Sequence, residues 1–304
     1  PLNLIPRQPM IASALAKQGV LYLKKNHLCE GIALDHALEA DLLLAEALGL
    51  KRVELLLNGK ISVSHDHARE YQALLVRRAR HEPVAYLLGH QDFFGLTFKT
   101  RPGALIPRPE TELLVELTLE HLNFCHDRHA LIDVGTGTGA IAAALAFHSG
   151  ESVLATEFSP LAAALAQENF KALGLAERIA LIPGSGITPA LSKRACKEAR
   201  ELIVVANLPY LTTIAWQNAQ PDIRDFEPRS ALDGGSDGLD LYRVLLNQLE
   251  DAPRPFILIA EIDPAQKETL PQEIQKRFPS AFIAKHQDLS GRDRVILAKV
   301  SRNL

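Results

Sequence analysis

A glycine-rich turn between an apolar segment and a helical segment most limits the folds open to this chain. The residues Ala130 to Val134 are apolar apart from Asp133, and Gly135-Thr136-Gly137-Thr138-Gly139 follows them directly. A helical run, 140–147, begins right after the last glycine. Glycines permit a tight turn and a close approach of the backbone to a ligand, and the first N–H groups of a helix are unpaired. This strand–turn–helix unit predicts an α/β fold with a ligand site at the turn.

The alternation of strands and helices continues along the chain. Further strands are expected at 153–156, 179–182, 202–206, 256–260 and 295–300, and helices at 161–173, 239–249 and 265–277. This order predicts a mainly parallel sheet covered by helices on both faces.

The N-terminal part has a different pattern. Apolar residues between 10 and 80 recur at three- and four-residue spacing, which predicts three helices at about 11–23, 34–48 and 66–80. Asp35 and Gly49 are typical residues for the start and the end of the second helix. The segments 84–88 and 93–98 are expected as strands of a β-hairpin or an extended linker. We therefore predict a helical domain at 1–83, a connector at 84–106 and an α/β domain at 107–304.

Composition and charge indicate the cellular compartment and the classes of partner. The net charge of -3 provides no general attraction for nucleic acid, and the three cysteines have no paired spacing. The N-terminus lacks the apolar core of a signal peptide, and no apolar run approaches the roughly 18 residues of a membrane span. We expect a cytoplasmic protein, a monomer, that binds neither membrane nor nucleic acid directly.

The glycine turn is compatible with two cofactors. Glu157 ends the next strand, 18 residues after Gly139, where a carboxylate can accept the hydroxyl groups of a ribose. A dinucleotide would use Gly135, Gly137 and Ala140 as the G-x-G-x-x-A pattern. S-adenosylmethionine carries positive sulfonium and amino groups, which Asp133 would suit. The three alternating glycines behind Asp133 favour S-adenosylmethionine.

A second turn closes the strand at 202–206. The apolar run stops at Asn207, and Pro209 cannot continue a central strand because it has no N–H group. We expect a rigid bend that holds an amide side chain beside exposed carbonyl groups, at the sheet edge where ligands bind. An ordinary strand-ending turn is the alternative.

Several motifs together resemble those of a known family. They are Leu105 to Glu112 (Leu-Ile-Pro-Arg-Pro-Glu-Thr-Glu), Asp133 to Ile141, Asn207 to Tyr210, Glu227 to Leu232, Gly234 to Gly238 and Asp288 to Arg294. The chain resembles the class I S-adenosylmethionine-dependent methyltransferases, and more closely the release-factor glutamine methyltransferases (the PrmC or HemK family), from about residue 37 to 300.

The resemblance implies a Rossmann-like fold with a seven-stranded, mainly parallel sheet, a small N-terminal helical bundle and a β-hairpin connector. It also implies methyl transfer from S-adenosylmethionine to the glutamine amide in the Gly-Gly-Gln loop of a peptide chain release factor. The Asn207 oxygen and the Leu208 carbonyl would accept the amide hydrogens, Pro209 would stiffen the bend, and Tyr210 would pack over the site. Phe94 and Pro109 would line the substrate channel. The implied cofactor-binding residues are Asp133, Gly135, Thr136, Gly137, Thr138, Gly139, Glu157, Ser185 and Asn207.

The sequence departs from the family pattern at four positions. Leu208 replaces a usual proline, Glu157 replaces aspartate, and Asp263 stands where glycine is common. The acidic residue usual at the end of the third strand is replaced within 182–186, where Ser185 could hydrogen-bond the adenine instead.

Other functions compete with this interpretation. The Asn-Leu-Pro-Tyr sequence also resembles rRNA adenine dimethyltransferases, and a ribosomal protein is another possible substrate. A degenerate methyltransferase that only binds cofactor is a non-enzymatic alternative. His121, Cys125, His126 and His129 have metal-binding side chains but no recognised zinc spacing, so no metal is expected.

Overall fold

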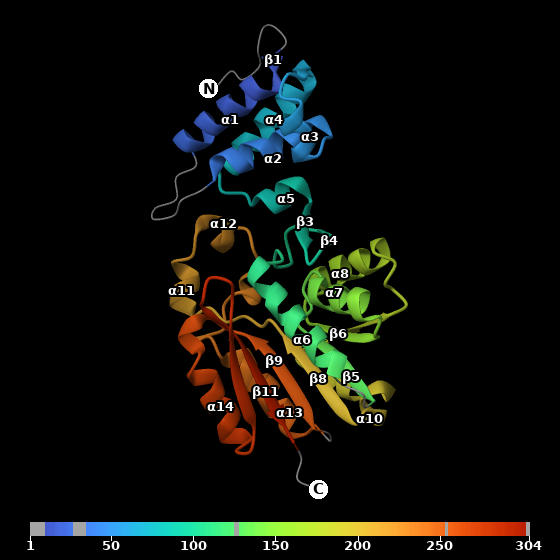
Figure 1. The fold of residues 1–304 in the computed structure, drawn as a ribbon. Helices are drawn as coiled ribbons and strands as arrows, with labels where there is room; N and C mark the ends of the chain where they lie inside the picture. The colour runs from blue at the N-terminus through green and yellow to red at the C-terminus, as the bar shows by residue number, and fades with distance from the viewer. Residues whose placement is uncertain (1–9, 27–34, 125–127, 253–254, 302–304) are drawn as a thin grey trace. The chain divides into compact units, whose positions relative to one another are not determined.

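The computed structural model describes residues 10–26, 35–124, 128–252 and 255–301. The chain forms two compact units (Figure 1). One unit contains the residues up to Gly89 together with the segment Gln220–Phe226, and the other contains His90–Ala219 and the residues from Glu227 onward. A short piece of the C-terminal half therefore packs in the helical unit, which the sequence pattern did not indicate.

The helical unit forms around an apolar core. Its elements are β1 (Met10–Ile11), α1 (Ala12–Asn26), α2 (His36–Leu48), α3 (Arg52–Leu57), β2 (Ser62–Val63), α4 (His65–Arg78), α5 (Val84–Leu88) and α12 (Pro221–Arg224). The predicted ends of the second helix are confirmed, because Asp35 accepts the N–H of Leu38 and Gly49 ends the helix at φ 64°. Leu34, included in the expected helix, lies outside the described residues.

The segment Val84–Leu88 is a helix, α5, so the predicted strand is wrong. Pro83 stands at its N-cap and Gly89, with φ 74°, at its C-cap. A five-residue apolar run cannot be assigned to helix or strand by periodicity alone, and the flanking proline and glycine favoured the helix. A β-hairpin follows, but with other strands than expected: β3 (His90–Phe93) pairs with β4 (Leu96–Lys99), and the turn at Phe94 and Gly95 lies inside the segment 93–98 that was expected as one strand.

The second unit contains a seven-stranded sheet, as expected. Its strands are β5 (His129–Val134), β6 (Val153–Glu157), β7 (Ile179–Pro183), β8 (Glu201–Ala206), β9 (Phe256–Glu261), β10 (Phe282–Gln287) and β11 (Asp293–Val300). The order is β10-β11-β9-β8-β5-β6-β7; β11 runs antiparallel to β10 and β9, and the other neighbouring strands are parallel. The order reverses between β5 and β8, and ligands bind at such a switch point in open α/β sheets.

Helices cover both faces of this sheet, as the strand pattern predicted. Ile132 and Val204 belong to an apolar cluster with α13 (Asp240–Glu250) and α14 (Thr269–Arg277). Leu131 and Ile203 belong to another cluster with α6 (Glu112–Phe124), α7 (Ala140–Ser149) and α8 (Pro160–Ala172). Alternate residues of one strand point to opposite faces, so near-continuous apolar strands fill both layers. Shorter helices of this unit are η1 (Pro109–Thr111), α9 (Thr188–Leu191), α10 (Arg194–Glu198), α11 (Thr213–Gln217), η2 (Arg229–Ala231) and η3 (Pro264–Gln266).

In the described ranges, no helix combines the length and the apolar character that crossing a membrane would need.

Candidate active site

A cavity of about 630 Å³ lies at the carboxyl ends of the parallel strands. It brings together the residues that follow β5, β6, β7 and β8, although these are far apart in the sequence. Among the predicted site residues, the cavity wall contains Gly135, Thr136, Gly137, Thr138, Glu157, Ser185, Asn207, Leu208 and Pro209.

The glycine turn needs its glycines for two reasons. Gly135, Gly137 and Gly139 have φ values of 74°, 58° and 84°, which side chains disfavour. A Cβ atom on Gly139 would also lie 2.4 Å from the ring of Phe170. The N–H groups of Gly135 and Thr136 both donate to the Thr156 carbonyl at 2.9 Å, which holds the turn against β6.

Asp133 lies beneath the turn rather than on the cavity wall. Its Oδ2 accepts hydrogen bonds from Thr136 Oγ1 at 2.6 Å and from the N–H of Ala142 at 3.1 Å. Burial raises the pKa of this carboxyl group to about 7, although these two hydrogen bonds lower it. Asp133 therefore connects the turn to the start of α7.

Glu157 hydrogen-bonds the glycine turn. One carboxylate oxygen accepts the N–H of Gly137 at 2.8 Å, and the other accepts the N–H of Ser159 at 2.7 Å. Each oxygen has a further lone pair, so the group retains acceptor capacity toward the cavity.

Ser185 lies in a loop that a residue from α13 holds in place. Gln248 Oε1 accepts the N–H of Ile187 at 2.7 Å, and a Cβ atom on Gly186 would lie only 2.1 Å from the same oxygen. Sequence reasoning did not identify Gln248, which stands 61 residues from its partner.

The Asn207 side chain has a defined orientation. Its Nδ2 donates a 3.0 Å hydrogen bond to Oγ1 of Thr111, the threonine of the Pro-Arg-Pro-Glu-Thr-Glu segment. Leu208 is buried, and its methyl group Cδ2 would be 3.2 Å from a Cβ atom on Gly135. The Asn207 turn and the Pro-Arg-Pro-Glu-Thr-Glu segment therefore meet at the cavity.

A second glycine loop, Gly234 to Gly238, packs against the turn that contains Asn207 to Tyr210. A Cβ atom on Gly234 would lie 2.3 Å from the Pro209 carbonyl oxygen, and one on Gly238 would lie 2.1 Å from that of Tyr210. The Gln266 Nε2 donates to the carbonyls of Tyr210, at 2.9 Å, and Asp237, at 3.1 Å. These close approaches explain the glycines at 234 and 238.

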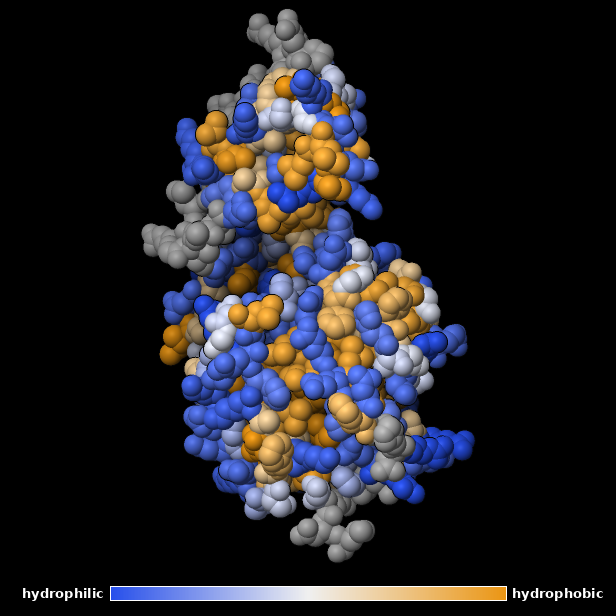
Figure 2. Space-filling view, in the orientation of Figure 1, coloured by the Kyte–Doolittle hydropathy of each residue, from blue (hydrophilic) through white to orange (hydrophobic). Residues whose placement is uncertain are grey.

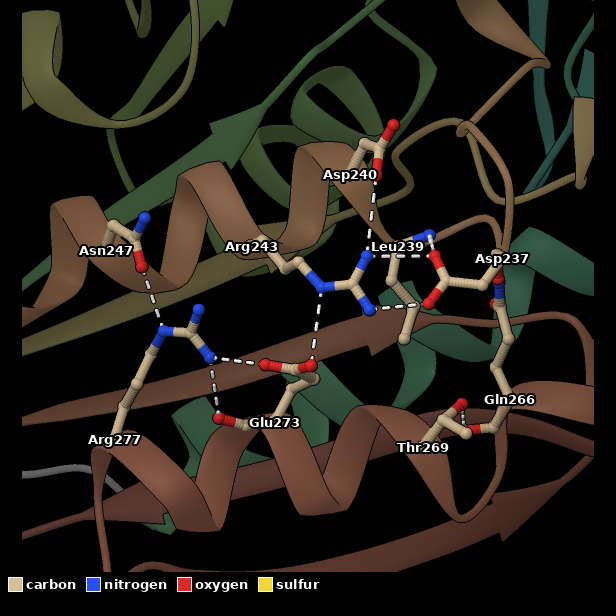
Figure 3. Close-up of polar contacts among 9 residues, drawn as sticks. All are labelled: Asp237, Leu239, Asp240, Arg243, Asn247, Gln266, Thr269, Glu273 and Arg277. Carbon is tan, nitrogen blue, oxygen red and sulfur yellow. Dashed lines mark hydrogen bonds and ion pairs between the residues drawn. The ribbon is translucent and has the colours of Figure 1, made fainter.

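Charged side chains support the same loop from α13 and α14 (Figure 3). Arg243 Nη1 donates to Asp237 at 2.9 Å, and its Nε donates to Glu273 at 3.3 Å. The Asp237 side chain also accepts the N–H of Leu239. Arg243 and these bonds hold the pKa of Asp237 below its usual value.

Phe94, Pro109 and Tyr210 lie beside the cavity wall. The Phe94 ring packs edge to face on His148, with 5.0 Å between centroids, and its N–H donates to Glu112. The neighbouring Phe93 and Arg108 contribute to the wall. Pro109 begins η1 and thereby places Thr111 at the site.

Arg108 joins two of the family motifs. Its guanidinium pairs with the buried Glu227, which also accepts the N–H of Ile106 at 3.0 Å. The described residues hold no group of three or more side chains suited to a metal ion. Cys125 and His126 of the histidine–cysteine group lie outside the described ranges.

Comparison with known proteins identifies the family. Residues 30–89 match the family model for the PrmC N-terminal domain, and residues 110–214 match that for ribosomal protein L11 methyltransferase (PrmA). The release factor glutamine methyltransferase of Moorella thermoacetica is 40% identical over 265 residues, covering 86% of this chain and 90% of that protein. The chain belongs to the release factor glutamine methyltransferase family. The one from Geobacter sulfurreducens is 37% identical, covering 92% of this chain and 95% of that protein.

Family membership confirms the resemblance inferred from the motifs and makes the chain a methyltransferase. Solved structures agree on the fold alone. The human METTL16 catalytic domain in complex with MAT2A 3′UTR hairpin 1 has a TM-score of 0.51 at 17% identity, covering 96% of this chain and 92% of that one. The complex with hairpin 6 has a TM-score of 0.53 at 19% identity, covering 76% and 82%.

Proposed function

We propose that this enzyme transfers a methyl group from S-adenosylmethionine to the side-chain amide of the glutamine in the Gly-Gly-Gln loop of a peptide chain release factor. The observation that carries the proposal is the orientation of Asn207. Because its nitrogen donates to Thr111, its Oδ1 is left to accept a hydrogen from the substrate. Membership of the family gives the substrate class.

The cavity wall fits this cofactor. Gly135 and Gly137 leave room for a ligand near the backbone, and Glu157 offers carboxylate oxygens to ribose hydroxyls. Ser185, in the loop after β7, would face the adenine. Thr136 and Thr138 line the cavity. Asp133 holds the turn through Thr136, and Gly139 lets the turn pack against Phe170. When bound, S-adenosylmethionine supplies an electrophilic methyl group.

The substrate side must orient a poor nucleophile. An amide nitrogen is weakly nucleophilic because its lone pair is delocalised into the carbonyl group. Asn207 Oδ1 and the Leu208 carbonyl would accept its two hydrogens and hold the nitrogen in line with the methyl group. No general base is needed before transfer, because the methylated amide nitrogen can lose its extra proton afterwards.

Leucine at position 208 is compatible with this role. The proposed acceptor is its backbone carbonyl, which leucine and proline share. The side chain is buried against Gly135, and Pro209 is retained after it. We propose Tyr210 as a support for this turn, and Phe94 and Pro109 as residues at the entrance for the release factor.

We further propose that the helical unit recognises the release factor. Apolar side chains gather at the surface of this unit (Figure 2), and Val53, Leu56 and Leu57 of α3 are more than half exposed. Residues 53–57 fall within the region that matches the PrmC N-terminal domain. We place the reaction in the cytoplasm, in a monomeric enzyme.

A direct comparison of substrates tests this proposal. The enzyme would be incubated with labelled S-adenosylmethionine and a release factor, a ribosomal protein or an rRNA fragment. We expect label in the release factor alone. Calorimetry with S-adenosylmethionine provides the second readout, because an inactive module without cofactor binding would give no heat.

A further inference from the structure

Two buried side chains hydrogen-bond the backbone at the two ends of the turn 207–210. One is Tyr242, on α13, and the other is Gln266, the last residue of η3. Tyr242 is fully buried and Gln266 is 4% exposed, and neither belongs to the cavity wall. Both side chains therefore reach the site only through the backbone that they hold.

Gln266 holds the end of the turn. Its Nε2 donates to the Tyr210 carbonyl at 2.9 Å and to the Asp237 carbonyl at 3.1 Å. Its Oε1 accepts the N–H of Asp263 at 3.1 Å. A backbone N–H can only donate and a carbonyl oxygen can only accept, so these three partners permit a single orientation of the amide. Gln266 therefore joins the turn to the second glycine loop in one defined arrangement.

The surroundings of Gln266 are built to fit this amide. A Cβ atom on Gly238 would lie 2.3 Å from its Nε2, so glycine at this position leaves the space that the amide needs. Asp263, one of the departures from the family pattern, caps η3, because its side chain accepts the N–H of Ala265 at 2.9 Å. The short helix that presents Gln266 is thereby fixed at its start.

Tyr242 holds the start of the turn. The ladder between β8 and β9 ends at the pair Ala206 and Ala260, and Asn207 follows directly. The Tyr242 hydroxyl hydrogen-bonds the Ala206 carbonyl, at 3.2 Å, and the carbonyl of Glu261, the last residue of β9. The hydroxyl has one proton, so it donates to one carbonyl at a time. Tyr242 thus connects the ends of both strands at the point where the turn begins.

The side chain at the end of the turn is attached to the same strand. The Tyr210 hydroxyl donates to Oε1 of Glu261 at 3.1 Å. The backbone and the ring of Tyr210 are therefore held separately, the first by Gln266 and the second by β9.

We propose that Gln266 and Tyr242 are positioning residues for methyl transfer. They hold the backbone at both ends of the turn, and this backbone places the Asn207 side chain and the Leu208 carbonyl. The inference rests on the proposed function, because it takes these two groups as the acceptors of the substrate amide. Two acceptors can receive the two hydrogens of one amide nitrogen only at a suitable spacing, and a displacement of about 1 Å can slow a reaction about 100-fold.

Substitutions that conserve shape test the inference. Tyr242→Phe removes the hydroxyl and keeps the ring, whereas Gln266→Met keeps the length of the side chain and removes its three hydrogen bonds. Thr118→Val is the matched control, because Thr118 is also buried and its hydroxyl donates to the Leu114 carbonyl within α6.

Each protein is assayed for methylation of a release factor at a temperature well below its melting temperature. The rate at saturating release factor and the KM for the release factor are determined separately. The dissociation constant for S-adenosylmethionine, by calorimetry, and the melting temperature are measured in parallel.

We expect Tyr242→Phe and Gln266→Met each to lower the rate at saturating release factor about tenfold, because both acceptors remain present but lose their spacing. The KM for the release factor and the dissociation constant for S-adenosylmethionine should change less than about threefold. Thr118→Val should lower the melting temperature by a similar amount, yet leave the rate within about threefold of the parent. This contrast separates a misplaced turn from the loss of a buried hydrogen bond.

A double-mutant cycle with Asn207→Ala shows whether the effect passes through the turn. Without the Asn207 side chain, only the Leu208 carbonyl is left to be misplaced. Gln266→Met should therefore slow transfer by only about threefold in the Asn207→Ala background. An equal loss, about tenfold, in both backgrounds would mean that Gln266 acts independently of Asn207, and it would overturn the inference.

The outcomes separate this inference from the proposed function. Absence of transfer to the release factor by the parent enzyme would overturn both. Transfer by the parent, with Tyr242→Phe and Gln266→Met equally fast, would overturn the inference and leave the function standing. Changes confined to the KM or to the melting temperature would also overturn it. Should Tyr242→Phe fail to fold, Gln266→Met and its cycle with Asn207→Ala decide.

Discussion

The side chain of Asn207 donates a 3.0 Å hydrogen bond to Thr111, a residue 96 positions earlier in the sequence. This bond joins the turn after β8 to the segment that begins α6. It places an amide oxygen at a cavity whose wall also contains the glycine turn and Glu157. The relationship turns a common strand-ending sequence into a site that can hold the amide of another molecule.

Asn207→Ala should lower the rate of methyl transfer about 100-fold or more, because it removes one of the two proposed acceptors for the substrate amide. The dissociation constant for S-adenosylmethionine should change less than about threefold. Kinetics and calorimetry measure the two effects. Asn247→Ala is the control, since Asn247 accepts a hydrogen bond from Arg277 on the far side of α13. Normal turnover by the Asn207 variant would mean that another group accepts the substrate.

Leu208→Pro should leave the transfer rate within about threefold of the parent, because the proposed acceptor is the backbone carbonyl. The lost N–H makes only a 3.5 Å contact with the Tyr242 hydroxyl, so little stability is lost with it. The rate with release factor and the melting temperature check this. A large loss of rate with normal folding would show that the leucine side chain itself is required.

Gly139→Ala should abolish cofactor binding and destabilise the fold by about 3 kcal/mol, because the new Cβ atom overlaps the Phe170 ring. Gly174→Ala is the matched control. Gly174 also has a positive φ, 71°, but no atom lies within 4 Å of an added Cβ. Backbone strain alone should lower the free energy of unfolding of Gly174→Ala by about 1 kcal/mol. Chemical denaturation measures the free energy of unfolding of both variants. Equal losses of stability in Gly139→Ala and Gly174→Ala would argue against the packing explanation.

The stability of the cofactor-free protein should depend on Asp133. Burial raises its pKa from 3.8 to about 7. The folded protein therefore holds this proton more tightly than the unfolded chain does, and this stabilising contribution is lost as the pH rises through 7. The melting temperature of Asp133→Asn relative to the parent should be higher at pH 8.5 than at pH 5.5. A difference that does not change with pH would contradict this assignment.

Exposed apolar residues on α3 provide a test of the helical unit. Replacing Val53 and Leu57 by aspartate should raise the KM for the release factor about tenfold, because apolar contacts with a partner are lost. The dissociation constant for S-adenosylmethionine should not change. Leu289→Asp, at a fully exposed loop position of the other unit, is the control. An unchanged KM would place the recognition surface elsewhere.

Sequence pattern predicted the sheet well because its strands are apolar and separated by clear helices. It missed β10, whose residues Phe282 to Gln287 are largely polar or exposed, as is common for a strand at the sheet edge. It also misassigned 84–88, where five apolar residues have no distinguishing period.

Within the site, pattern and resemblance identified residues that line the cavity, since these stand in contiguous motifs. They did not identify Glu261, Gln248 or Gln266, which act through side-chain contacts across large separations. Gln266 reaches the Tyr210 carbonyl over 56 positions. A single buried glutamate or glutamine has no local signal, because its role depends on which strands and helices become neighbours.

The most direct test of the account is to map the methyl group. The enzyme, methyl-labelled S-adenosylmethionine and a purified release factor would be incubated together, and the modified residue located by mass spectrometry. The account predicts one methyl group on the side-chain nitrogen of the glutamine in the Gly-Gly-Gln loop, formed about 100-fold or more slowly by Asn207→Ala than by the parent enzyme. A methyl group on any other residue, or one that Asn207→Ala forms as fast as the parent enzyme, would contradict it.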